Sequence, residues 1–503
     1  MPIINSLISW INLKRLNQID DIRHNPFYYQ EETFNYLMWK ADRTEWGKKY
    51  DYRNIKSIET YQDRVPISGY EDLQPYIHRM MEGESNVLWP RDIKWYAKSS
   101  GTTNDKSKYI PVSRDSLEEC HFKGGKDVFV LYTDNVPDTK TYTGKGLTLG
   151  GSHQVSNVND QSRVGDLSAI YIENVPFFLD LKRTPEASIA LIEKFEEKIQ
   201  RIAETSIKEN VTSIVGVPSW NLIMLKHILE ATGKDNIHEI WPNLEVFVHG
   251  GINFEPYREQ YQKILPNPGM NYIETYNASE GFFAIQDDLN DRSMLLMMDY
   301  GIFYEFIPFE DIDKENPNTL TVADVETNKV YAVVISTNGG LWRYMLGDTV
   351  EFTSLYPHKI IIKGRTKHYI NAFGEELMIE NAELALKNTC AKTDAIISEY
   401  TAAPKYIDDE SKGRHQWLIE FARDPESHVQ FAEILDKELQ KVNSDYEAKR
   451  QTGSTLDAPE LIPAKKSLFI EWMRKRGKMG GQNKIPRLAN HREYIEELME
   501  LNN

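Results

Sequence analysis

Several short stretches of this sequence carry side chains that could bind a negatively charged ligand. The first lies within Lys98–Ser113, where one glycine stands among four hydroxyl residues: Ser99, Ser100, Gly101, Thr102 and Thr103. The glycine lets the backbone turn so that successive N–H groups point to one side, and the hydroxyls add donors, so such a loop can hold a phosphate. It is not a Walker loop, because neither GxxxxGKS nor GxxxxGKT occurs in the chain. Taken alone, such a run is more often an ordinary turn.

A second stretch, Thr275–Gly281, follows a run that predicts a strand. It should therefore lie at the carboxyl end of the sheet, where open α/β folds bind ligands. A tyrosine there can stack on a nucleobase, a serine hydroxyl can reach a phosphate oxygen, and a glutamate can hold Mg²⁺, which takes hard oxygen ligands. The candidates are Thr275, Tyr276, Asn277, Ser279 and Glu280. On its own, the stretch fits an exposed loop with an incidental acid better.

Two further stretches place charged groups at turns. Asp348 follows Gly347 and could accept hydrogen bonds from both hydroxyls of a ribose, although Gly-Asp is also common in hairpin turns. Gly364–Lys367 contains Arg365 and Lys367 and stands where we expect a domain boundary. It is equally compatible with a plain connecting loop.

The last stretch, Gly480–Arg487, combines glycines with one lysine, Lys484, and a proline, which predicts a mobile loop carrying a cation. The basic residues just before it, within Arg474–Lys478, suggest a nucleic-acid patch. Because the chain is acidic overall and the cluster is short, a solvated basic face explains them better.

Alternating strands and helices must position these stretches. Residues 1–95 predict mainly helix, and beyond them short apolar runs alternate with segments of helical spacing. The predicted strands are Gly146–Gly150, Val211–Val217, Leu244–His249 and Tyr272–Tyr276, and the predicted helices are Ala187–Asn210 and Trp220–Thr232, the second ended by Gly233. This alternation predicts a mostly parallel sheet covered by helices on both faces.

The C-terminal part of the sequence has a different pattern. Met294–Ile362 consists of short β-rich runs separated by turn signals, which predicts an antiparallel region appended to the parallel sheet. After it, charged helices at Glu376–Lys387 and Val429–Lys449 flank a strand at Trp417–Phe421. We therefore expect an α/β fold with a large N-terminal domain, residues 1–366, and a small mobile α+β domain, residues 367–503.

Composition excludes several classes of protein. The chain has 503 residues and a formal net charge of −17, which disfavours broad nucleic-acid binding. Its two cysteines make neither a disulfide framework nor a zinc site and fit a reducing compartment. No apolar run is long enough to span a bilayer, and the N-terminus lacks the features of a signal peptide. We expect a cytoplasmic protein with no membrane, nucleic-acid or stable protein partner.

The joint order of these stretches resembles the adenylate-forming superfamily, and in detail it is most similar to the Gretchen Hagen acyl acid–amido synthetases, the auxin-responsive promoter family. The resembling segments are KSSGTT, VGVPSW at Val215–Trp220, VHGGINFEPY at Val248–Tyr257, TYNASEG, YMLGD, VNSDYEAKR at Val442–Arg450 and NKIPR. They extend from Lys98 to Arg487, so the resemblance covers most of the chain. Two departures from the superfamily pattern are Asn104–Lys108 after the threonines and Asn277–Ala278 before Ser-Glu.

The resemblance implies ATP and Mg²⁺ as cofactors and a small carboxylic acid and an amino acid as substrates. It implies adenylation of the acid, followed by transfer of the acyl group to the amine. In this scheme Ser99–Thr103 hold the β- and γ-phosphates and Lys484 is the catalytic cation. Glu280 would bind Mg²⁺, and Ser279 would contact the α-phosphate. Tyr276 would pack on adenine, and Asp348 would bind the ribose. Arg365 would lie near the nucleotide at the hinge, and Lys367 would be the hinge residue itself. Gly146–His153 would either line the acyl pocket or form a structural strand.

Two alternatives remain open at the level of sequence. The acceptor could be coenzyme A or a carrier thiol instead of an amino acid. A silent nucleotide-binding or scaffold protein is a third possibility, which the charged residues present in every stretch argue against.

Overall fold

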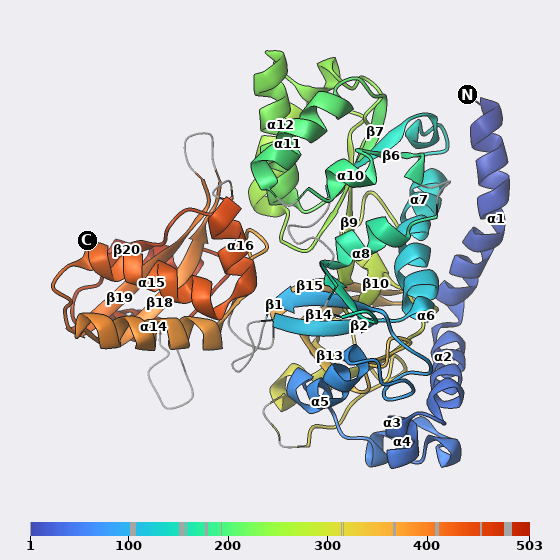
Figure 1. Ribbon diagram of the computed structural model, residues 1–503, viewed down its shortest axis with the longest axis horizontal. Helices are drawn as coiled ribbons and strands as arrows, with labels where there is room; N and C mark the ends of the chain where they lie inside the picture. Colours follow the sequence, from blue (N-terminus) through green and yellow to red (C-terminus); the bar gives the residue numbers. More distant parts are fainter. Residues whose placement is uncertain are drawn as a thin grey trace.

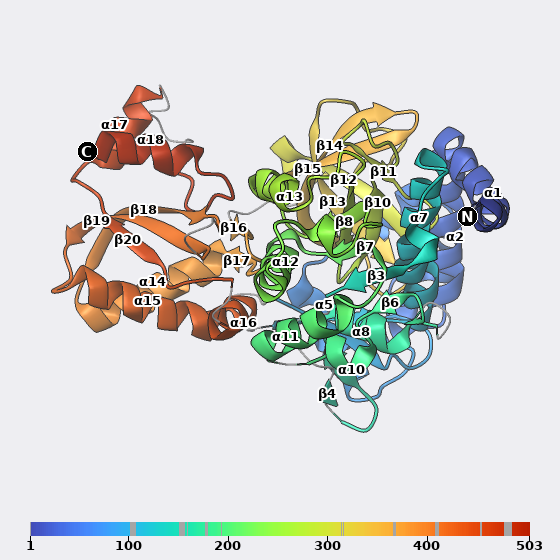
Figure 2. The same ribbon diagram turned by 90° about the horizontal axis from the view of Figure 1, so that it is seen from above.

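The computed structural model describes residues 2–502 apart from 101–106, 150–155, 158, 177–179, 193, 313, 315, 366–368, 408–411, 453–454 and 477–484. The chain forms a large N-terminal part and a smaller C-terminal part, which lie side by side, with the two termini at opposite ends of the molecule (Figures 1 and 2). Among the described residues, no helix has the length and apolar character needed to cross a membrane.

The predicted helical N-terminus is confirmed. Its helices are α1 Pro2–His24, α2 Pro26–Ala41, α3 Glu45–Lys49, α4 Ile58–Arg64 and α5 Tyr70–Met81. Helix α2 is fixed to the body by Gln30, whose side-chain amide donates to the carbonyls of Met298 at 3.1 Å and Ile302 at 2.9 Å. These helices therefore cover one side of the main sheet, where residues such as Phe34 and Leu37 join its core.

The described strands include an 11-stranded sheet. In spatial order they are β12 Ile302–Pro308, β13 Val330–Thr337, β14 Tyr344–Leu355, β15 His358–Arg365, β11 Met294–Leu296, β10 Gly281–Ile285, β9 Asn271–Ala278, β8 Val246–Gly250, β7 Val211–Gly216, β3 Lys145–Thr148 and β6 Arg183–Thr184. Strand β9 pairs parallel with β8 and antiparallel with β10. The predicted parallel and antiparallel regions thus both occur, but they are halves of one sheet joined at β9, and the predicted fold class is confirmed.

Helices cover the parallel half of the sheet. They are α7 Lys123–Asn135, α8 Leu167–Asn174, α10 Ala187–Ala190, α11 Phe195–Ser206, α12 Pro218–Thr232 and α13 Arg258–Ile264. The single helix predicted for Ala187–Asn210 is wrong, because it is two helices. Helix α12 ends as predicted at Gly233, which adopts a left-handed conformation with φ of 63°.

A second, smaller sheet was not predicted. It contains β1 Trp95–Ser100, β2 Ser107–Val112, β5 Arg163–Gly165 and β4 Ser156–Asn157, in the order β2-β1-β5-β4. After β2 the chain enters α6 Arg114–Ser116 and a π-helical turn, η2 Leu117–Phe122, which leads directly into α7.

The C-terminal part has its own two- and three-stranded sheets. Its strands are β16 Tyr369–Ile370, β17 Leu377–Met378, β18 Ile396–Lys405, β19 Arg414–Arg423 and β20 Glu460–Pro463, and its helices are α14 Ile379–Thr393, α15 His428–Val442, α16 Ser444–Thr452, α17 Leu468–Lys475 and α18 Glu493–Asn502. The helix predicted for Val429–Lys449 breaks at Asn443, which is fully buried. The Asn443 side chain accepts from the Tyr446 amide at 2.7 Å and donates to the Glu376 carbonyl at 3.0 Å, so it ends α15 and begins α16.

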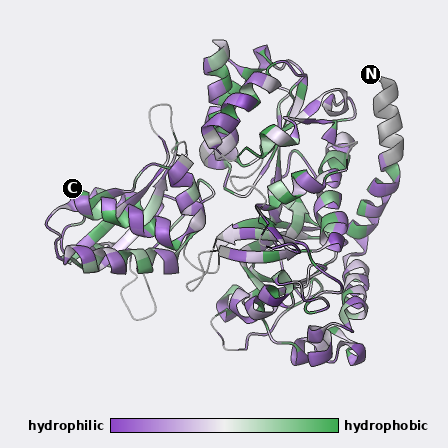
Figure 3. Cartoon of the chain, in the orientation of Figure 1, coloured by the Kyte–Doolittle hydropathy of each residue, from purple (hydrophilic) through white to green (hydrophobic). Residues whose placement is uncertain are grey.

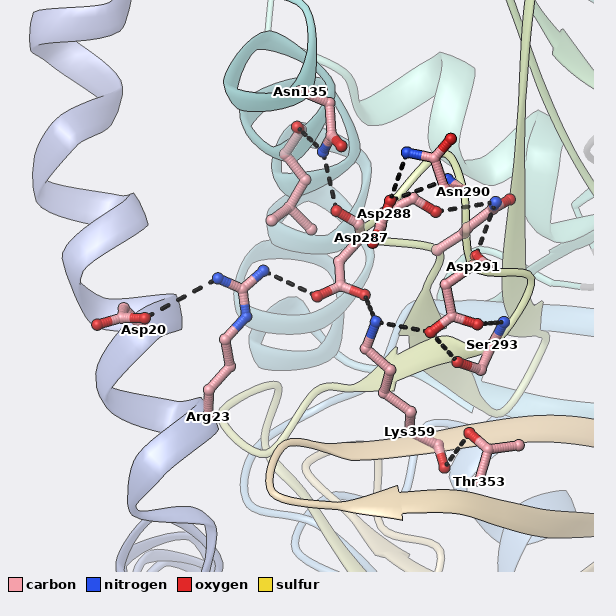
Figure 4. Close-up of polar contacts among 12 residues, drawn as sticks. Asp20, Arg23, Asn135, Asp287, Asp288, Asn290, Asp291, Ser293, Thr353 and Lys359 are labelled. Carbon is pink, nitrogen blue, oxygen red and sulfur yellow. Dashed lines mark hydrogen bonds and ion pairs between the residues drawn. The ribbon is translucent and has the colours of Figure 1, made fainter.

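Ion pairs anchor α1 to the antiparallel half of the sheet (Figure 4). The Asp287 carboxylate binds Arg23 of α1 at 2.8 Å and Lys359 of β15 at 2.9 Å, and Lys359 also reaches Asp291 at 3.0 Å. Asp287 is only 8% exposed, so its charge is stabilised by these two cations. Hydrophobic and hydrophilic residues alternate along the helices (Figure 3), as expected where one face of a helix packs on the core.

Candidate active site

A cavity of about 1580 Å³ lies where the main sheet, the hairpin β1–β2 and the C-terminal part meet. The carboxyl ends of three parallel strands are aligned beside it, with Gly216 paired to His249 and Gly250 paired to Thr275. A Cβ atom on Gly250 would lie 2.5 Å from the Thr275 carbonyl oxygen, so only glycine fits this close approach. The predicted position of the site at the carboxyl edge of the sheet is where this cavity is found.

The second predicted stretch spans the turn between β9 and β10 rather than a long exposed loop. All five of its candidate residues line the cavity: Thr275, Tyr276, Asn277, Ser279 and Glu280. The Thr275 hydroxyl donates to the His249 carbonyl at 3.1 Å, which ties β9 to β8. Ser279 and Glu280 occupy the turn itself and are partly exposed to the cavity.

Tyr276 and Asp348 are brought together although 72 residues separate them. The Tyr276 hydroxyl donates to Asp348 Oδ2 at 2.6 Å, and both residues line the cavity. The Tyr276 ring is 6% exposed and packs against Phe283 at a centroid distance of 4.7 Å. Asp348 is paired across the sheet with Arg365, so the backbone of Arg365 lies next to it; the Arg365 side chain is outside the described part. Tyr276 is thus in direct contact with Asp348, the residue expected to bind the ribose.

The hydroxyl-rich run lies partly in a hairpin. Ser99 and Ser100 are the last residues of β1 and not part of a loop, and Ser100 is paired with Ser107 of β2. Gly101, Thr102 and Thr103 lie outside the described residues. Ser99 lines the cavity, as do Lys98 and Lys108. Lys108 is the strand partner of Ser99.

The two remaining predicted residues, Lys367 and Lys484, lie outside the described residues. Ile485, next to Lys484, packs in the outer cluster of the C-terminal part, which includes Trp472 and Leu498. The C-terminal part contributes other residues to the cavity wall, among them Asp445 and Lys449 of α16.

Lys449 is a buried cation that the sequence analysis did not single out. It is 5% exposed, and its ammonium lies 4.0 Å from the centroid of the Trp220 ring, across the boundary between the two parts. The Trp220 indole in turn donates to the Phe373 carbonyl at 3.2 Å. Burial lowers the pKa of Lys449, and the nearby Asp445 and Asp166 carboxylates oppose this shift. The contact holds α16 against α12.

Lys198 of α11 is a second buried lysine in the same region. It is 1% exposed, and burial lowers its pKa to about 8; Asp166 opposes the shift and the charge of Lys449 adds to it. Lysines within helices usually face solvent, so the burial of Lys198 and Lys449 was not predicted, although Lys449 lies within the resembling segment Val442–Arg450.

Burial shifts the pKa of two titratable residues on the part of the cavity wall formed by β8 and β9. The His249 ring stacks on Phe254 at a centroid distance of 4.2 Å, and burial lowers the pKa of His249 to about 3. Burial also raises the pKa of Glu274. Both residues line the cavity: Glu274 lies on the same strand as Tyr276, and His249 lies on the neighbouring strand β8.

A magnesium ion fits the site only as a partner of a bound nucleotide. Among the described residues, no three acidic, histidine or cysteine side chains gather closely enough to hold a metal ion by themselves. Glu280 offers a single carboxylate, and Mg²⁺ commonly binds through one or two carboxylates together with phosphates and waters.

The fold is similar to those of solved ligase structures. A solved structure of the GH3.15 acyl acid amido synthetase aligns with a TM-score of 0.60 at 16% identity, covering 97% of this chain and 96% of that one. A 2-hydroxyisobutyryl-CoA ligase in complex with 2-HIB-AMP and CoA aligns with a TM-score of 0.54 at 14% identity, covering 94% and 91%. At these identities, the structures establish a shared fold.

Sequence relatives give the same grouping. The chain is 23% identical to the indole-3-acetic acid-amido synthetase GH3.3 of Arabidopsis thaliana, over 97% of this chain and 93% of that protein. It is 22% identical to the jasmonoyl–L-amino acid synthetase JAR4 of Nicotiana attenuata, over 65% and 67%. Family models match residues 15–270 as the GH3 family N-terminal domain, 295–365 as its central domain and 380–493 as its C-terminal domain. The predicted resemblance is confirmed: this chain belongs to the GH3 family.

Proposed function

We propose that this protein is an ATP-dependent acyl acid–amido synthetase. It activates a carboxylic acid as an acyl-adenylate and then joins the acyl group to the amine of an amino acid. The observation that carries the proposal is that Ser99, Glu280 and Asp348, from three separate segments of a GH3-family chain, surround one cavity. Relatives named as amido synthetases of indole-3-acetic acid and of jasmonate support this class of reaction.

In the first step, a carboxylate oxygen of the acid attacks the α-phosphorus of ATP, and the bond to pyrophosphate breaks. Both reactants are anions, so the step needs neutralisation of charge more than covalent catalysis. The hairpin with Ser99–Thr103 holds the β- and γ-phosphates, and Ser279 contacts the α-phosphate. Asp348 holds the ribose and Tyr276 packs on adenine, which fits their hydrogen bond at the cavity wall.

Glu280 is the residue that would hold Mg²⁺ beside the phosphates. Bound there, the ion withdraws negative charge from the phosphoryl oxygens. Thr275 and Asn277, on the same strand as Tyr276, complete the nucleotide site.

Lys484 supplies the cation between the carboxylate and the α-phosphate, a role suited to a point charge on a flexible stem. The C-terminal domain, residues 367–503, then rotates about Lys367 relative to residues 1–366, with Arg365 at the hinge beside the nucleotide. Two observations support such a rotation. The described strands before and after the hinge belong to separate sheets, and Ile485 packs away from the cavity while α16 faces it.

In the second step, the amine nitrogen attacks the acyl carbon, the bond to AMP breaks and the amine loses a proton. Incubation with ATP, Mg²⁺ and a panel of acids, adding amino acids or coenzyme A in turn, tests the acceptor. We expect amino acids to stimulate AMP release and an amide to form. Stimulation by coenzyme A alone would assign the protein to thioester formation, and nucleotide binding without pyrophosphate release would make it a silent binder.

A further inference from the structure

Two uncharged polar side chains line the cavity beside a group of apolar residues. They are His121, in the π-helical turn η2, and Tyr171, in α8. The residues around them on the cavity wall include Phe122, Gly125, Val128, Phe129 and Ile172. A π-helical turn within a helix is uncommon and is often found at functional sites.

His121 is buried without a hydrogen-bonding partner. Its side chain is 4% exposed, and no hydrogen bond joins its imidazole to any residue that the structure describes. Burial lowers the pKa of His121 to about 4, so the ring is neutral near pH 7 and offers one N–H donor and one acceptor nitrogen. The ring nitrogens are not among the fully enclosed atoms that lack a partner, and His121 lines the cavity, so the imidazole is open to a ligand bound there.

Tyr171 also lines the cavity, and its helix α8 packs beside η2. Its ring meets Phe122 edge-on at a centroid distance of 4.7 Å, and its hydroxyl lies over Gly125, where a Cβ atom would come within 2.9 Å of the oxygen. Within the described part of the chain the hydroxyl has no hydrogen-bonding partner. Burial raises the pKa of Tyr171 to about 12, so the phenol is also neutral.

This section of the cavity adjoins the turn that carries Ser279 and Glu280. A Cβ atom on Gly124 would lie 2.5 Å from the Phe282 ring, and the Phe282 amide donates to Cys120 Sγ at 3.2 Å. Phe282 follows Glu280 by two residues in β10. The start of α7 is therefore pressed against the strand that begins at the proposed reaction centre.

We propose that His121 and Tyr171 select the acyl acid by binding a neutral hydrogen-bonding substituent, such as a hydroxyl, on its hydrocarbon part. The inference rests on the proposed function, because it assigns this section of the cavity to the acid. The apolar residues accept an aryl or alkyl group of the acid. His121 and Tyr171 form hydrogen bonds with an oxygen or nitrogen substituent at one position of that group. A second carboxylate on the acid is disfavoured, because burial in this section of the cavity disfavours charged groups and also keeps the His121 imidazole neutral.

Matched pairs of aromatic acids that differ by one ring hydroxyl test this selection. The measured quantity is kcat/KM for acid-dependent pyrophosphate release by the wild type, His121→Phe and Tyr171→Phe. We expect the wild type to prefer the hydroxylated member about tenfold at one ring position, the range of one or two neutral hydrogen bonds. Each variant should bring that ratio towards one, chiefly by lowering kcat/KM for the hydroxylated acid. Tyr29→Phe, which removes a hydroxyl bonded to Asp21 outside the cavity, should leave the ratio unchanged.

A ratio near one for every pair in the wild type, or a ratio unchanged in both variants, would overturn the proposal. Tyr171→Phe removes a single oxygen, so the test stands even where His121→Phe does not fold. Calorimetry of the binding of the same acids without ATP distinguishes the proposed reaction from the proposed selection of the acid. Selective binding without pyrophosphate release contradicts the proposed reaction alone, whereas pyrophosphate release without selection contradicts this inference alone.

Discussion

Removing the hydroxyl of Tyr276 should weaken ATP binding through Asp348. The bond between them is 2.6 Å long, as is typical when a hydroxyl donates to a carboxylate. Hydrogen bonds to charged groups contribute about 1.5–3 kcal/mol, and water in the cavity replaces part of this in Tyr276→Phe. A loss of about 1.4 kcal/mol corresponds to roughly a tenfold rise in the KM for ATP. The phenyl ring stays in place, so stacking on adenine is retained.

The assay is pyrophosphate release as a function of ATP concentration, repeated with 2′-deoxy-ATP. If Asp348 binds the ribose hydroxyls, 2′-deoxy-ATP is a poorer substrate for the wild type, and this penalty shrinks in Tyr276→Phe, since the two changes act on one interaction. Tyr29→Phe is the matched control, because its hydroxyl also donates to an aspartate, Asp21, at 2.7 Å on the surface. An unchanged KM for ATP in Tyr276→Phe, or an equal rise for ATP and 2′-deoxy-ATP, would refute the reasoning.

Two further predictions concern charge. Glu280→Gln should raise the Mg²⁺ concentration needed for half-maximal activity by about tenfold, because it removes the carboxylate proposed for the ion; an unchanged magnesium titration counts against the role. Burial lowers the pKa of Lys198 from 10.5 in the unfolded chain to about 8 in the folded protein. Between these two pH values the unfolded chain binds more protons than the folded protein. The free energy of unfolding therefore rises by up to ~3 kcal/mol as the pH increases from 8 to 10.5. Lys198→Met should lack this gain in denaturant unfolding at pH 7.5 and 9.5, whereas an identical pH dependence in both proteins would show that the shift does not arise in the folded state.

The sequence predicted the main elements because their signals are local. Apolar runs such as Val211–Val217 mark buried parallel strands, and Gly233 marks the end of α12. The break at Asn443 was missed, because the periodicity continues through it and only the buried side-chain hydrogen bonds end the helix. We also did not predict that the two halves of the sheet join at β9, because the sequence of one strand alone does not determine which strand it pairs with.

For the site, motifs predicted which residues meet but not how they meet. Tyr276 and Asp348 were assigned to different parts of a nucleotide, and their direct hydrogen bond depends on β14 and β9 approaching in space. His121 lies in none of the resembling segments, and Lys449 lies in one of them, Val442–Arg450, but was given no role there. Their significance comes from burial: one is a cation over an indole ring, and the other is an imidazole without a partner among the described residues.

The central claim is that the protein adenylates a carboxylic acid with the aid of Lys484. Acid-dependent exchange of labelled pyrophosphate into ATP, with no amino acid present, tests it most directly in the wild type and in Lys484→Ala. We predict exchange that requires the acid in the wild type, and loss of most of it in Lys484→Ala with ATP binding retained. Absence of exchange with every acid of an aryl, indolyl and fatty-acid panel would contradict adenylation, and full exchange in Lys484→Ala would contradict the role of the lysine.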